Sequence, residues 1–473
     1  MVMGEAIQET EIAVIGAGPG GYVAAIRLAQ LGKQVVLIDK AGLGGICLHV
    51  GCIPSKALIT ASNFFGMANR KNEMGISVGG VSLDSKKLHE WKKASIKQLE
   101  KGIEGLCAKL GIEVVKGTAT IEDSETIRVS SEHGTGVIKF RQCIINTGTT
   151  PVEYPGLEYA NDFVWNSDHA MDIEFIPRDL VVIGGGYIGV ELASVYAKFG
   201  CNVSVVQRSE RILTQMDSDA ALVVQKKMSV HGIHLFLNSV FKSAHRDKNR
   251  VSVTIESGGK KSVIETEKIL VALGRVPNTK HIGLENTRVQ LNENGFIRVN
   301  AQCQTSDPKI WAIGDVTGPP LLAHRATRMG KVCAEAIAGQ PAAFDNKAIP
   351  GVVFSDPELA SVGLTEKEAK EKGIEIIVGK FPFHALGRAV STDKTEGFVK
   401  VIADRNTQVV LGVVAVGEHV SEFIGEAALA IEMGAQLEDI AATIHPHPTF
   451  SEALMEACEE ALGKAIHVTQ KKK

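Results

Sequence analysis

The chain has 473 residues, 44% of them hydrophobic, a net charge of −3 and eight cysteines. This length is enough for about three domains, and the mixed charges give no reason to expect a nucleic-acid partner. No stretch reaches about 18 consecutive apolar residues, and residues 1–10 lack an apolar core, so we expect neither a membrane span nor secretion. The cysteines are scattered apart from one close pair, which favours a reducing, cytoplasmic compartment over a disulphide framework.

The N-terminal region begins with a nucleotide-binding pattern. An apolar strand over residues 11–15 leads into G-x-G-x-x-G, formed by Gly16, Gly18 and Gly21, and a helical stretch follows. The next strand ends in Asp39, where dinucleotide folds place an acid for a ribose hydroxyl, about 20 residues after the first glycine. Glycines let the backbone approach a pyrophosphate at the helix N-terminus. The pattern therefore predicts a dinucleotide site.

The next feature is a pair of cysteines, Cys47 and Cys52, in the segment 44–56. On a regular helix, residues five apart have Cα atoms about 8.7 Å apart. A disulphide needs about 4.4 to 6.8 Å. We expect Gly51, by adopting an unusual φ, and Pro54, by starting a new helical turn, to supply the irregularity that a bridge requires. The pair is predicted to be a redox-active dithiol.

Two alternatives to a redox pair remain open at this point. Cysteine is among the most buried residue types, so the two thiols could be ordinary core residues. The chain also contains the residue types of a Cys2His2 zinc site, namely Cys47, Cys52, His445 and His447. Structural zinc sites favour histidines separated by three to five residues, and here only Pro446 lies between them, so we expect no metal.

The first pattern then returns. A strand over 180–183 is followed by Gly184, Gly186 and Gly189, again as G-x-G-x-x-G, with Glu191 on the helix behind them. Two such folds predict two nucleotides, one a tightly held flavin dinucleotide and the other an exchanging nicotinamide. The alternative is a duplication in which one site is inactive.

The second repeat differs from the first at the end of its second strand. Gln207 stands there in place of the acid at Asp39. Glutamine keeps a hydrogen-bond acceptor but removes the carboxylate that repels the 2′-phosphate of NADP. Arg208, alone or with Arg211, is a candidate to hold that phosphate, and the alternative is that both arginines point into solvent.

The C-terminal region supplies a candidate base. A thiol with an ordinary pKa of about 8.5 is a poor nucleophile at neutral pH, so thiol exchange is helped by a histidine that a carboxylate holds. His447 with Glu452 fits this requirement. For His445 we expect only a polar structural role.

Taken together with these features, segments 274–278 and 311–315 resemble the pyridine nucleotide-disulphide oxidoreductases. Within that family, segments 21–27 and 53–56 are similar to the dihydrolipoyl dehydrogenases, and the resemblance covers residues 11–468. It implies an α/β fold with two Rossmann-like dinucleotide-binding domains and an α+β C-terminal dimerisation domain. The implied boundaries are 1–150 for the FAD domain, 151–279 for the NAD domain, 280–348 for a central domain that returns to FAD, and 349–473 for the dimerisation domain.

The resemblance also implies roles for individual residues. The catalytic set is Cys47, Cys52, His447, Glu452, Lys56 and Glu191, with Lys56 and Glu191 paired beside the flavin, where their field favours the reduced ring. The residues implied to contact FAD are Gly16, Gly18, Gly21, Asp39, Lys56, Gly117, Thr147, Gly148, Asp315, Leu321, Leu322, Ala323 and His324. Those implied to contact NAD are Gly184, Gly186, Gly189, Glu191 and Gly274, to which we add Gln207 and Arg208.

The implied reaction begins when dihydrolipoamide, deprotonated by His447, attacks Cys47. The second substrate thiol then releases lipoamide, and Cys52 passes the electrons through FAD to NAD. The family places His447 and Glu452 across a homodimer interface, so each active site would be composite. The implied partners are lipoyl domains and the E2 core of a 2-oxo acid dehydrogenase complex.

Some residues depart from the family pattern or leave alternatives open. His49, Asn146 and Pro446 stand where Asn, Ala and Ala are more usual. Tyr187 is typical of glutathione reductases, so an NADPH-linked disulphide reductase is the first alternative, and a flavoprotein subunit without disulphide turnover is the second. Because the dihydrolipoyl dehydrogenases use NAD, we expect NAD to be preferred with weaker discrimination than usual.

Overall fold

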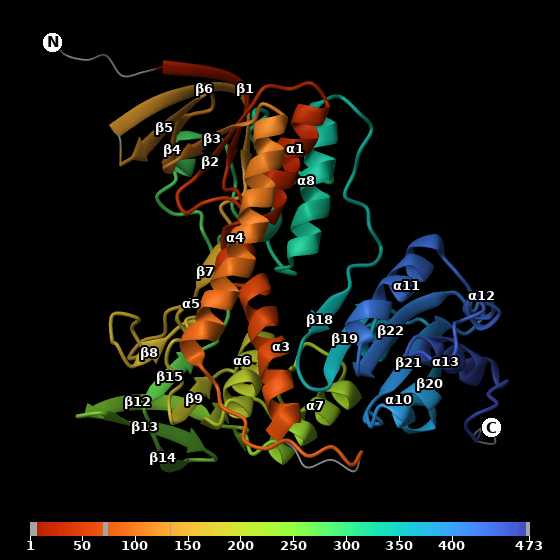
Figure 1. Ribbon diagram of the computed structural model, residues 1–473. Coiled ribbons are helices and arrows are strands. Elements are labelled where there is room, and N and C mark those ends of the chain that lie inside the picture. The colour runs from red at the N-terminus through yellow and green to blue at the C-terminus, as the bar shows by residue number, and fades with distance from the viewer. Residues whose placement is uncertain (1–6, 70–73, 133, 470–473) are drawn as a thin grey trace.

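The computed structural model describes residues 7–69, 74–132 and 134–469, and Figure 1 shows their arrangement. Three sheet-based units are visible, one at the top of the view, one at the lower left and one at the lower right. Residues 1–6, which belong to the stretch considered for a signal sequence, lie outside the described residues.

The upper unit is built on a seven-stranded sheet. Its parallel strands are β3 (Glu113–Lys116), β2 (Val35–Asp39), β1 (Ile7–Ile15), β6 (Gly134–Ile145) and β17 (Ile310–Ala312), and β5 (Thr126–Ser131) and β4 (Thr118–Asp123) extend it in antiparallel pairing. Residues 35–38 of β2 and residues 12–15 of β1 are apolar and buried, which suits parallel strands that are covered on both faces. The helices of this unit are α1 (Pro19–Gln30), α4 (Ser85–Lys109) and α8 (Ala323–Ile337). Since β17 and α8 come late in the chain, the chain returns to this unit.

The lower left unit holds a second parallel sheet, in the order β11-β10-β9-β15-β8. Its strands are β11 (His234–Phe236), β10 (Asn202–Val206), β9 (Asp179–Ile183), β15 (Lys268–Val271) and β8 (Val164–Trp165), with helices α5 (Ser167–Ala170), α6 (Tyr187–Lys198) and α7 (Ser218–Val230). An antiparallel meander of β12 (Val240–Asp247), β13 (Arg250–Ser257) and β14 (Lys260–Thr266) precedes β15. The chain enters and leaves this unit through β7 (Thr149–Pro151) and β16 (Arg275–Pro277), which pair with each other.

The lower right unit is an antiparallel sheet in the order β18-β19-β22-β21-β20. Its strands are β18 (Gly351–Val353), β19 (Glu358–Gly363), β22 (Val410–Gly417), β21 (Phe398–Asp404) and β20 (Ile376–Pro382), and its helices are α9 (Glu366–Glu371), α10 (Gly387–Ser391), α11 (Val420–Met433), α12 (Leu437–Ala441) and α13 (Glu452–Leu462). Large apolar side chains stay exposed on and after α11, among them Leu429, Met433 and Ile444, which is 95% exposed. The predicted fold class is confirmed, and the domain boundaries remain predictions.

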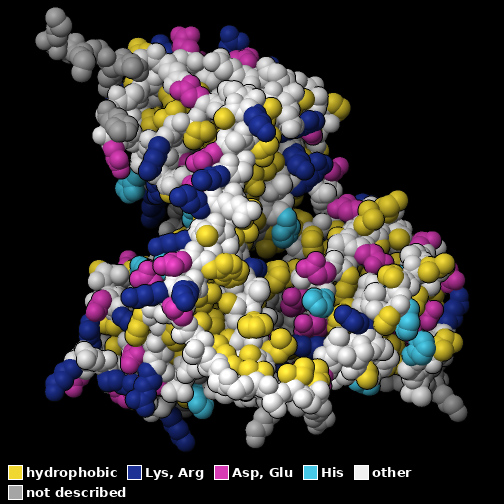
Figure 2. Space-filling model, viewed as in Figure 1, with side chains coloured by type: hydrophobic (Ala, Val, Ile, Leu, Met, Phe, Trp, Pro, Cys, Tyr) yellow, Lys and Arg dark blue, Asp and Glu magenta, His cyan; other side chains and the backbone are white. Residues whose placement is uncertain are grey.

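Two helices carry the cysteine pair, α2 (Gly45–His49) and α3 (Cys52–Asn69). Together they form the one stretch among the described residues that is long and apolar enough to cross a membrane, and 28% of its apolar 18-residue segment is buried. Hydrophobic side chains gather over α3 in Figure 2, where Phe64 and Met67 are exposed. The helix break and the ion-paired Lys56 inside the stretch are both unfavourable in a membrane.

Candidate active site and nucleotide loops

The cysteine pair lies at a break between two helices. Cys47 is in α2, Cys52 is the first residue of α3, and Val50 between them has φ −140° and ψ 17°, which ends α2. Both cysteines are free thiols and half-buried. The two thiols are close enough for each to shift the pKa of the other through hydrogen bonding. The irregularity expected from the sequence is therefore present.

The two thiols differ in acidity. The hydrogen bond from Cys47 lowers the pKa of Cys52 to about 7, and the charge of Lys56 lowers it further against the opposing effect of burial. The N-terminus of α3 is a position that favours a thiolate. The same hydrogen bond and burial raise the pKa of Cys47. Cys52 is therefore the better leaving group and Cys47 the thiol that keeps its proton.

The explanation expected for Gly51 is wrong. Its φ is outside the left-handed region. A Cβ at this position would lie 2.9 Å from the carbonyl oxygen of Ile46 and 3.3 Å from the Cα atom of Cys47. Glycine is needed because α3 starts so close to the preceding helix, which is a close approach and not a special dihedral angle. Pro54 lies in the first turn of α3, as expected.

Next to the dithiol, Lys56 pairs with Glu191. The Lys56 Nζ lies 2.9 Å from Glu191 Oε2, and the Glu191 side chain is only 7% exposed. The other carboxylate oxygen accepts a hydrogen bond of 2.9 Å from the backbone N–H of Phe354, whose ring lies 4.2 Å from Lys56 Nζ. This contact therefore joins α3, which carries the dithiol, to α6 of the second nucleotide-binding unit and to the segment that follows β18 in the C-terminal unit. Phe354 could not be identified from the sequence, since its contact with Glu191 spans more than 160 residues.

The first glycine loop closes tightly between β1 and α1. Gly16 has φ +99°, and a Cβ at Gly21 would lie 1.9 Å from the carbonyl oxygen of Gly16. One Asp39 oxygen accepts a 2.7 Å hydrogen bond from the N–H of Ala17. Gly18 is the N-cap of α1 and contributes no side-chain cap, so helix N–H groups are left for a ligand. This cradle fits a pyrophosphate.

The second glycine loop repeats this geometry between β9 and α6. Gly184 has φ +112°, and a Cβ at Gly189 would lie 2.0 Å from the carbonyl oxygen of Gly184. Gly186 is the N-cap of α6, also without a side-chain cap. Gln207 Oε1 accepts a 3.0 Å hydrogen bond from the N–H of Gly185. Both loops therefore fit the same chemical group.

Several other predicted flavin contacts lie near the end of β6 and the start of α8. Asp315 accepts a 3.4 Å hydrogen bond from the Thr149 hydroxyl, and burial raises the pKa of its carboxyl group. Thr147 and Asn278 exchange two hydrogen bonds of 2.8 and 2.9 Å. Arg275, which the sequence did not single out, donates to the Thr149 hydroxyl at 2.8 Å.

The remaining predicted contacts have backbone roles. Gly117 donates its N–H to the Asp39 carbonyl oxygen at 2.9 Å, and Gly148 and Gly274 have φ +68° and +121°. Leu322 is the N-cap of α8, flanked by Leu321 and Ala323, and His324 Nε2 is 2.7 Å from the carbonyl oxygen of Pro350. The contact of Gly274 with NAD and the contacts of the other residues with FAD stay predictions.

The candidate base and its carboxylate are joined as expected. His447 Nδ1 lies 2.9 Å from Glu452 Oε1, and the other carboxylate oxygen accepts a hydrogen bond of 2.7 Å from the N–H of Thr449. The His447 side chain is 76% exposed, so its Nε2 edge faces outward. Figure 1 places α13, which begins at Glu452, far from α3. One chain alone does not bring the base to the dithiol.

The second histidine has a different environment. The His445 side chain is 4% exposed, and its Nε2 is 2.8 Å from Glu426 Oε1. This hydrogen bond raises the pKa of His445. The two cysteines and the two histidines do not come together as a Cys2His2 metal site within one chain, because each histidine pairs with its own glutamate. Among the described residues, one group has the spacing of metal ligands, His89 with Asp172 and Glu174.

The two arginines near the second loop behave differently. Arg208 is exposed and makes no hydrogen bond or ion pair with any described residue. Arg211 donates to the carbonyl oxygens of Leu213 at 2.8 Å, Thr214 at 3.0 Å and Met216 at 3.2 Å. The expectation that Arg211 faces a phosphate or solvent is wrong, because its guanidinium group braces the loop that follows it.

The residues that depart from the family pattern each have a local contact. Asn146 is buried and its Nδ2 donates to the carbonyl oxygen of Gly16 at 3.1 Å, which closes the first glycine loop. His49 Nε2 is 2.9 Å from the carbonyl oxygen of Leu43. The Pro446 carbonyl oxygen accepts a 2.7 Å hydrogen bond from the Thr449 hydroxyl.

Comparison with known proteins places this site in a family. Residues 10–330 match the model described as pyridine nucleotide-disulphide oxidoreductase, and residues 349–458 match the dimerisation domain of the same family. The chain is 46% identical over 471 residues to dihydrolipoyl dehydrogenase from Geobacillus stearothermophilus, covering 100% of both chains. It is 44% identical over 472 residues to dihydrolipoyl dehydrogenase from Haloferax volcanii, covering 99% of each.

Solved structures agree with the sequence relatives. LpdA from Mycobacterium tuberculosis matches with a TM-score of 0.89 and 27% identity, over 95% of this chain and 99% of that one. The flavoprotein disulphide reductase RclA from Escherichia coli matches with a TM-score of 0.85 and 28% identity, over 95% and 99%. The predicted family is confirmed by the dithiol, the two cradles and these matches together. The chain therefore belongs to the pyridine nucleotide-disulphide oxidoreductase family, as a flavin-dependent enzyme whose cofactors are FAD and NAD.

Proposed function

We propose that the chain is a dihydrolipoyl dehydrogenase, which oxidises dihydrolipoamide to lipoamide and reduces NAD. The relatives of that name match the chain over essentially its full length. The observation that carries the proposal is the unequal pair of thiols at the start of α3, directly beside the Lys56–Glu191 ion pair. An acidic thiol and a less acidic one are what exchange with a substrate dithiol requires.

The two cofactors are assigned to different loops. The first loop, braced by Asp39 and closed by Asn146, would hold FAD, and the second, braced by Gln207, would hold NAD. FAD, when bound, supplies the two-electron chemistry that links the dithiol to NAD. Lys56, paired with Glu191, would place a positive charge near that cofactor.

The exchange step follows from the acidities of the two cysteines. Starting from the oxidised pair, a substrate thiolate attacks Cys47, the Cys47–Cys52 bond breaks, and Cys52 leaves as a thiolate. The second substrate thiol then attacks the mixed disulphide, so lipoamide is released and Cys47 takes up a proton. The substrate has lost two electrons and the enzyme holds them as a dithiol.

The base in this scheme is His447. Glu452 holds Nδ1, so the exposed Nε2 is the atom that would take the proton from the substrate thiol. Because the base is distant from the dithiol of its own chain, we infer that a second copy supplies it in a homodimer. Exposed apolar side chains on α11 and α3, such as Met433 at 76% and Phe64 at 68%, support such an interface.

The proposed substrate carrier is the lipoyl domain of a 2-oxo acid dehydrogenase complex, with the E2 core as the assembly partner. This follows from the activity, since dihydrolipoamide occurs on such domains. We place the reaction in the cytoplasm, where reducing conditions keep cysteines outside the redox pair as thiols. The other six described cysteines are free and buried, which supports this part of the proposal.

A comparison of substrates tests the proposal. Purified enzyme is assayed with dihydrolipoamide and NAD, with oxidised glutathione and NADPH, and with oxidised thioredoxin and NADPH. Dihydrolipoamide with NAD should be the best pair by far. Strong activity with oxidised glutathione and NADPH would instead assign the chain to the reductase alternative. Anaerobic titration with dithionite should take up four electrons per chain, whereas a flavoprotein without an active dithiol takes up two.

The base is tested by a matched pair of variants. His447→Ala should lose about 10²- to 10⁴-fold in turnover, the usual contribution of a general base. His445→Ala is the control, because His445 is buried against Glu426 and should affect stability more than turnover. If His445→Ala lost as much turnover while His447→Ala stayed near the wild type, the base would have to be reassigned.

A further inference from the structure

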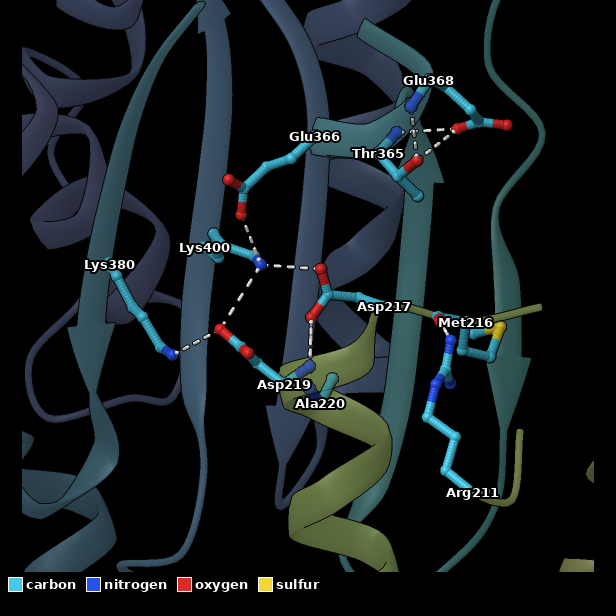
Figure 3. A network of polar contacts seen from close by, with 10 residues as sticks. All are labelled: Arg211, Met216, Asp217, Asp219, Ala220, Thr365, Glu366, Glu368, Lys380 and Lys400. Carbon is cyan, nitrogen blue, oxygen red and sulfur yellow. Dashed lines mark hydrogen bonds and ion pairs between the residues drawn. The ribbon is translucent and has the colours of Figure 1, made fainter. Parts of the chain in front are cut away.

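Lys400 on β21 is the centre of a buried ionic contact between the C-terminal sheet and the second nucleotide-binding unit (Figure 3). Its side chain is 4% exposed, and Nζ lies 2.6 Å from Asp217 Oδ2 and 2.8 Å from Glu366 Oε1. The Asp217 side chain is 7% exposed. Ion pairs in such surroundings are strongly interdependent, because removal of one partner leaves the other charge buried and uncompensated.

The second oxygen of Asp217 fixes the start of a helix. Asp217 is the N-cap of α7, and its Oδ1 accepts hydrogen bonds from the N–H groups of Asp219 at 3.0 Å and Ala220 at 3.2 Å. One carboxylate therefore joins a lysine of the C-terminal unit to the first turn of α7.

The segment just before Asp217 is held rigidly. In the loop 211–216, the Arg211 guanidinium group donates to the carbonyl oxygens of Leu213 and Met216. The backbone N–H of Ile212 donates a 3.3 Å hydrogen bond to Oε1 of Gln225, which lies on α7. The loop is therefore bonded both within itself and to Gln225 of α7.

The same loop supports the second glycine loop. The N–H of Leu213 donates to the carbonyl oxygen of Gly185 at 2.8 Å. A Cβ at Gly185 would lie 2.9 Å from Cγ2 of Ile212, so the two segments are in close contact. Gln207 completes the connection, because its Nε2 donates to the Arg211 carbonyl oxygen at 3.3 Å and its Oε1 accepts from Gly185. An unbroken set of contacts runs from Lys400 to the nucleotide loop.

We propose that Lys400 is a positioning residue for the nicotinamide nucleotide: through Asp217 and the loop 211–216, it holds the second glycine loop in its binding conformation. The inference rests on the proposed use of that loop by NAD. By this inference, the affinity for the nucleotide depends on Lys400, which lies in the region that matches the dimerisation domain of the family. No bond from Lys400 reaches the first glycine loop among the described contacts, so FAD binding should not depend on it.

The test compares Lys400→Met with Lys380→Met in the FAD-loaded enzyme. Lys380 is the matched control: it lies on the neighbouring strand β20, is 44% exposed, and pairs with Asp219 Oδ2 at 3.1 Å, an oxygen that is also 3.7 Å from Lys400 Nζ, but it makes no ion pair with Asp217. Binding of NADH is read from the concentration dependence of anaerobic flavin reduction. Lys400→Met should weaken NADH binding about tenfold, within the usual range for residues that act through a packed network. Lys380→Met should leave it unchanged.

A second measurement separates positioning from general damage. The rate of flavin reduction by dihydrolipoamide without NAD should stay within about twofold of the wild type in Lys400→Met, because that step uses the dithiol and not the second loop. Equal loss in both half-reactions would overturn the proposal, as would unchanged NADH binding. A wild type that fails to react with dihydrolipoamide would contradict the proposed function, while the NADH measurement would still decide the role of Lys400.

Asp217→Asn covers the case in which Lys400→Met does not fold. The amide keeps an oxygen to cap α7 but removes the charge that faces Lys400. This variant should weaken NADH binding in the same direction by a smaller factor. In the double variant with Lys400→Met, the two losses should be less than additive, since neither buried charge is then left alone. Additive losses would show that the two residues act separately.

Discussion

The two glycine loops have nearly the same backbone and differ in the side chain that braces them. In the first, the N–H of Ala17 donates to the Asp39 carboxylate at 2.7 Å, and in the second, the N–H of Gly185 donates to the Gln207 amide at 3.0 Å. The position after the second strand therefore has a structural task in both loops. What differs is the charge offered to a ligand, which is negative in the first loop and neutral in the second.

The loops also differ in how far they are enclosed. A Cβ at Gly18 would lie 3.3 Å from the buried Asn146 amide, whereas a Cβ at Gly186, the matching position of the second loop, would meet no atom within 4 Å. A closed loop suits a cofactor that stays bound, and an open one suits a nucleotide that exchanges at each turnover. The glycine pattern therefore predicts the shape of a phosphate cradle, while the neighbouring residues decide how the cradle is used.

The largest expected effect comes from matched changes in the two loops. In Gly21→Ala and Gly189→Ala, the new Cβ would lie 1.9 and 2.0 Å from a carbonyl oxygen of the same loop, so each cradle must open. Gly21→Ala should abolish FAD binding and all activity. Gly189→Ala should keep FAD and its reduction by dihydrolipoamide, yet lose NAD reduction. Flavin absorbance and NADH formation measure both, and the same phenotype in the two variants would remove the proposed division between the loops.

The second prediction separates both loops from the dithiol. Cys47→Ser and Cys52→Ser should each abolish dihydrolipoamide turnover, because no disulphide can form. Flavin content and anaerobic flavin reduction by NADH should persist, since neither glycine loop contains these cysteines. A variant that retained most of its dihydrolipoamide activity would contradict the proposed exchange step.

A smaller effect is expected on the acidity of Cys52, which the hydrogen bond from Cys47 lowers to a pKa of about 7. Because the pKa is lowered, the thiolate is present above about pH 7 and is lost below it. In the reduced protein, Cys47→Ser keeps a hydroxyl donor and should preserve this midpoint, whereas Cys47→Ala should move it upward. Thiolate absorbance against pH measures both. If Cys52 titrated at the same pH in Cys47→Ser and Cys47→Ala, its low pKa would have to come from Lys56 and the N-terminus of α3 instead.

The smallest expected effect concerns the choice between NAD and NADP at the second loop. Gln207→Glu restores the acid found in the first loop and should raise the preference for NAD about tenfold, the value of one charge-assisted hydrogen bond of about 1.4 kcal/mol. Arg208→Ala should weaken NADP by about fivefold or less, because an exposed ion pair contributes about 1 kcal/mol or less. Steady-state kcat/KM with both nucleotides measures these changes. If Arg208→Ala did not change kcat/KM for NADP, Arg208 would not contact the 2′-phosphate and would simply face solvent.

Local spacing predicted the features that lie close in the chain. Both glycine loops, the cysteine pair and the contact of His447 with Glu452 need only a few neighbouring residues, so the sequence contains them. Resemblance to a family supplied the pairing of Lys56 with Glu191, which is present at 2.9 Å.

Contacts between units could not be predicted in this way. Phe354 reaches Glu191 through its backbone, which no side-chain pattern reveals, and Lys400 meets Asp217 only after two units have packed together. Gly51 shows a different limit. Its identity indicated a special backbone angle, but the structure assigns it to a close approach between two helices, which depends on packing.

The central claim is that the dithiol and FAD take electrons from dihydrolipoamide, and that NAD at the second loop removes them. Anaerobic mixing of the FAD-loaded enzyme with dihydrolipoamide, first without and then with NAD, tests it most directly. The account predicts that the flavin spectrum changes in a single turnover without NAD, and that added NAD restores it with formation of NADH. A flavin spectrum that stays unchanged in dihydrolipoamide, or that only NADP restores, would contradict the account.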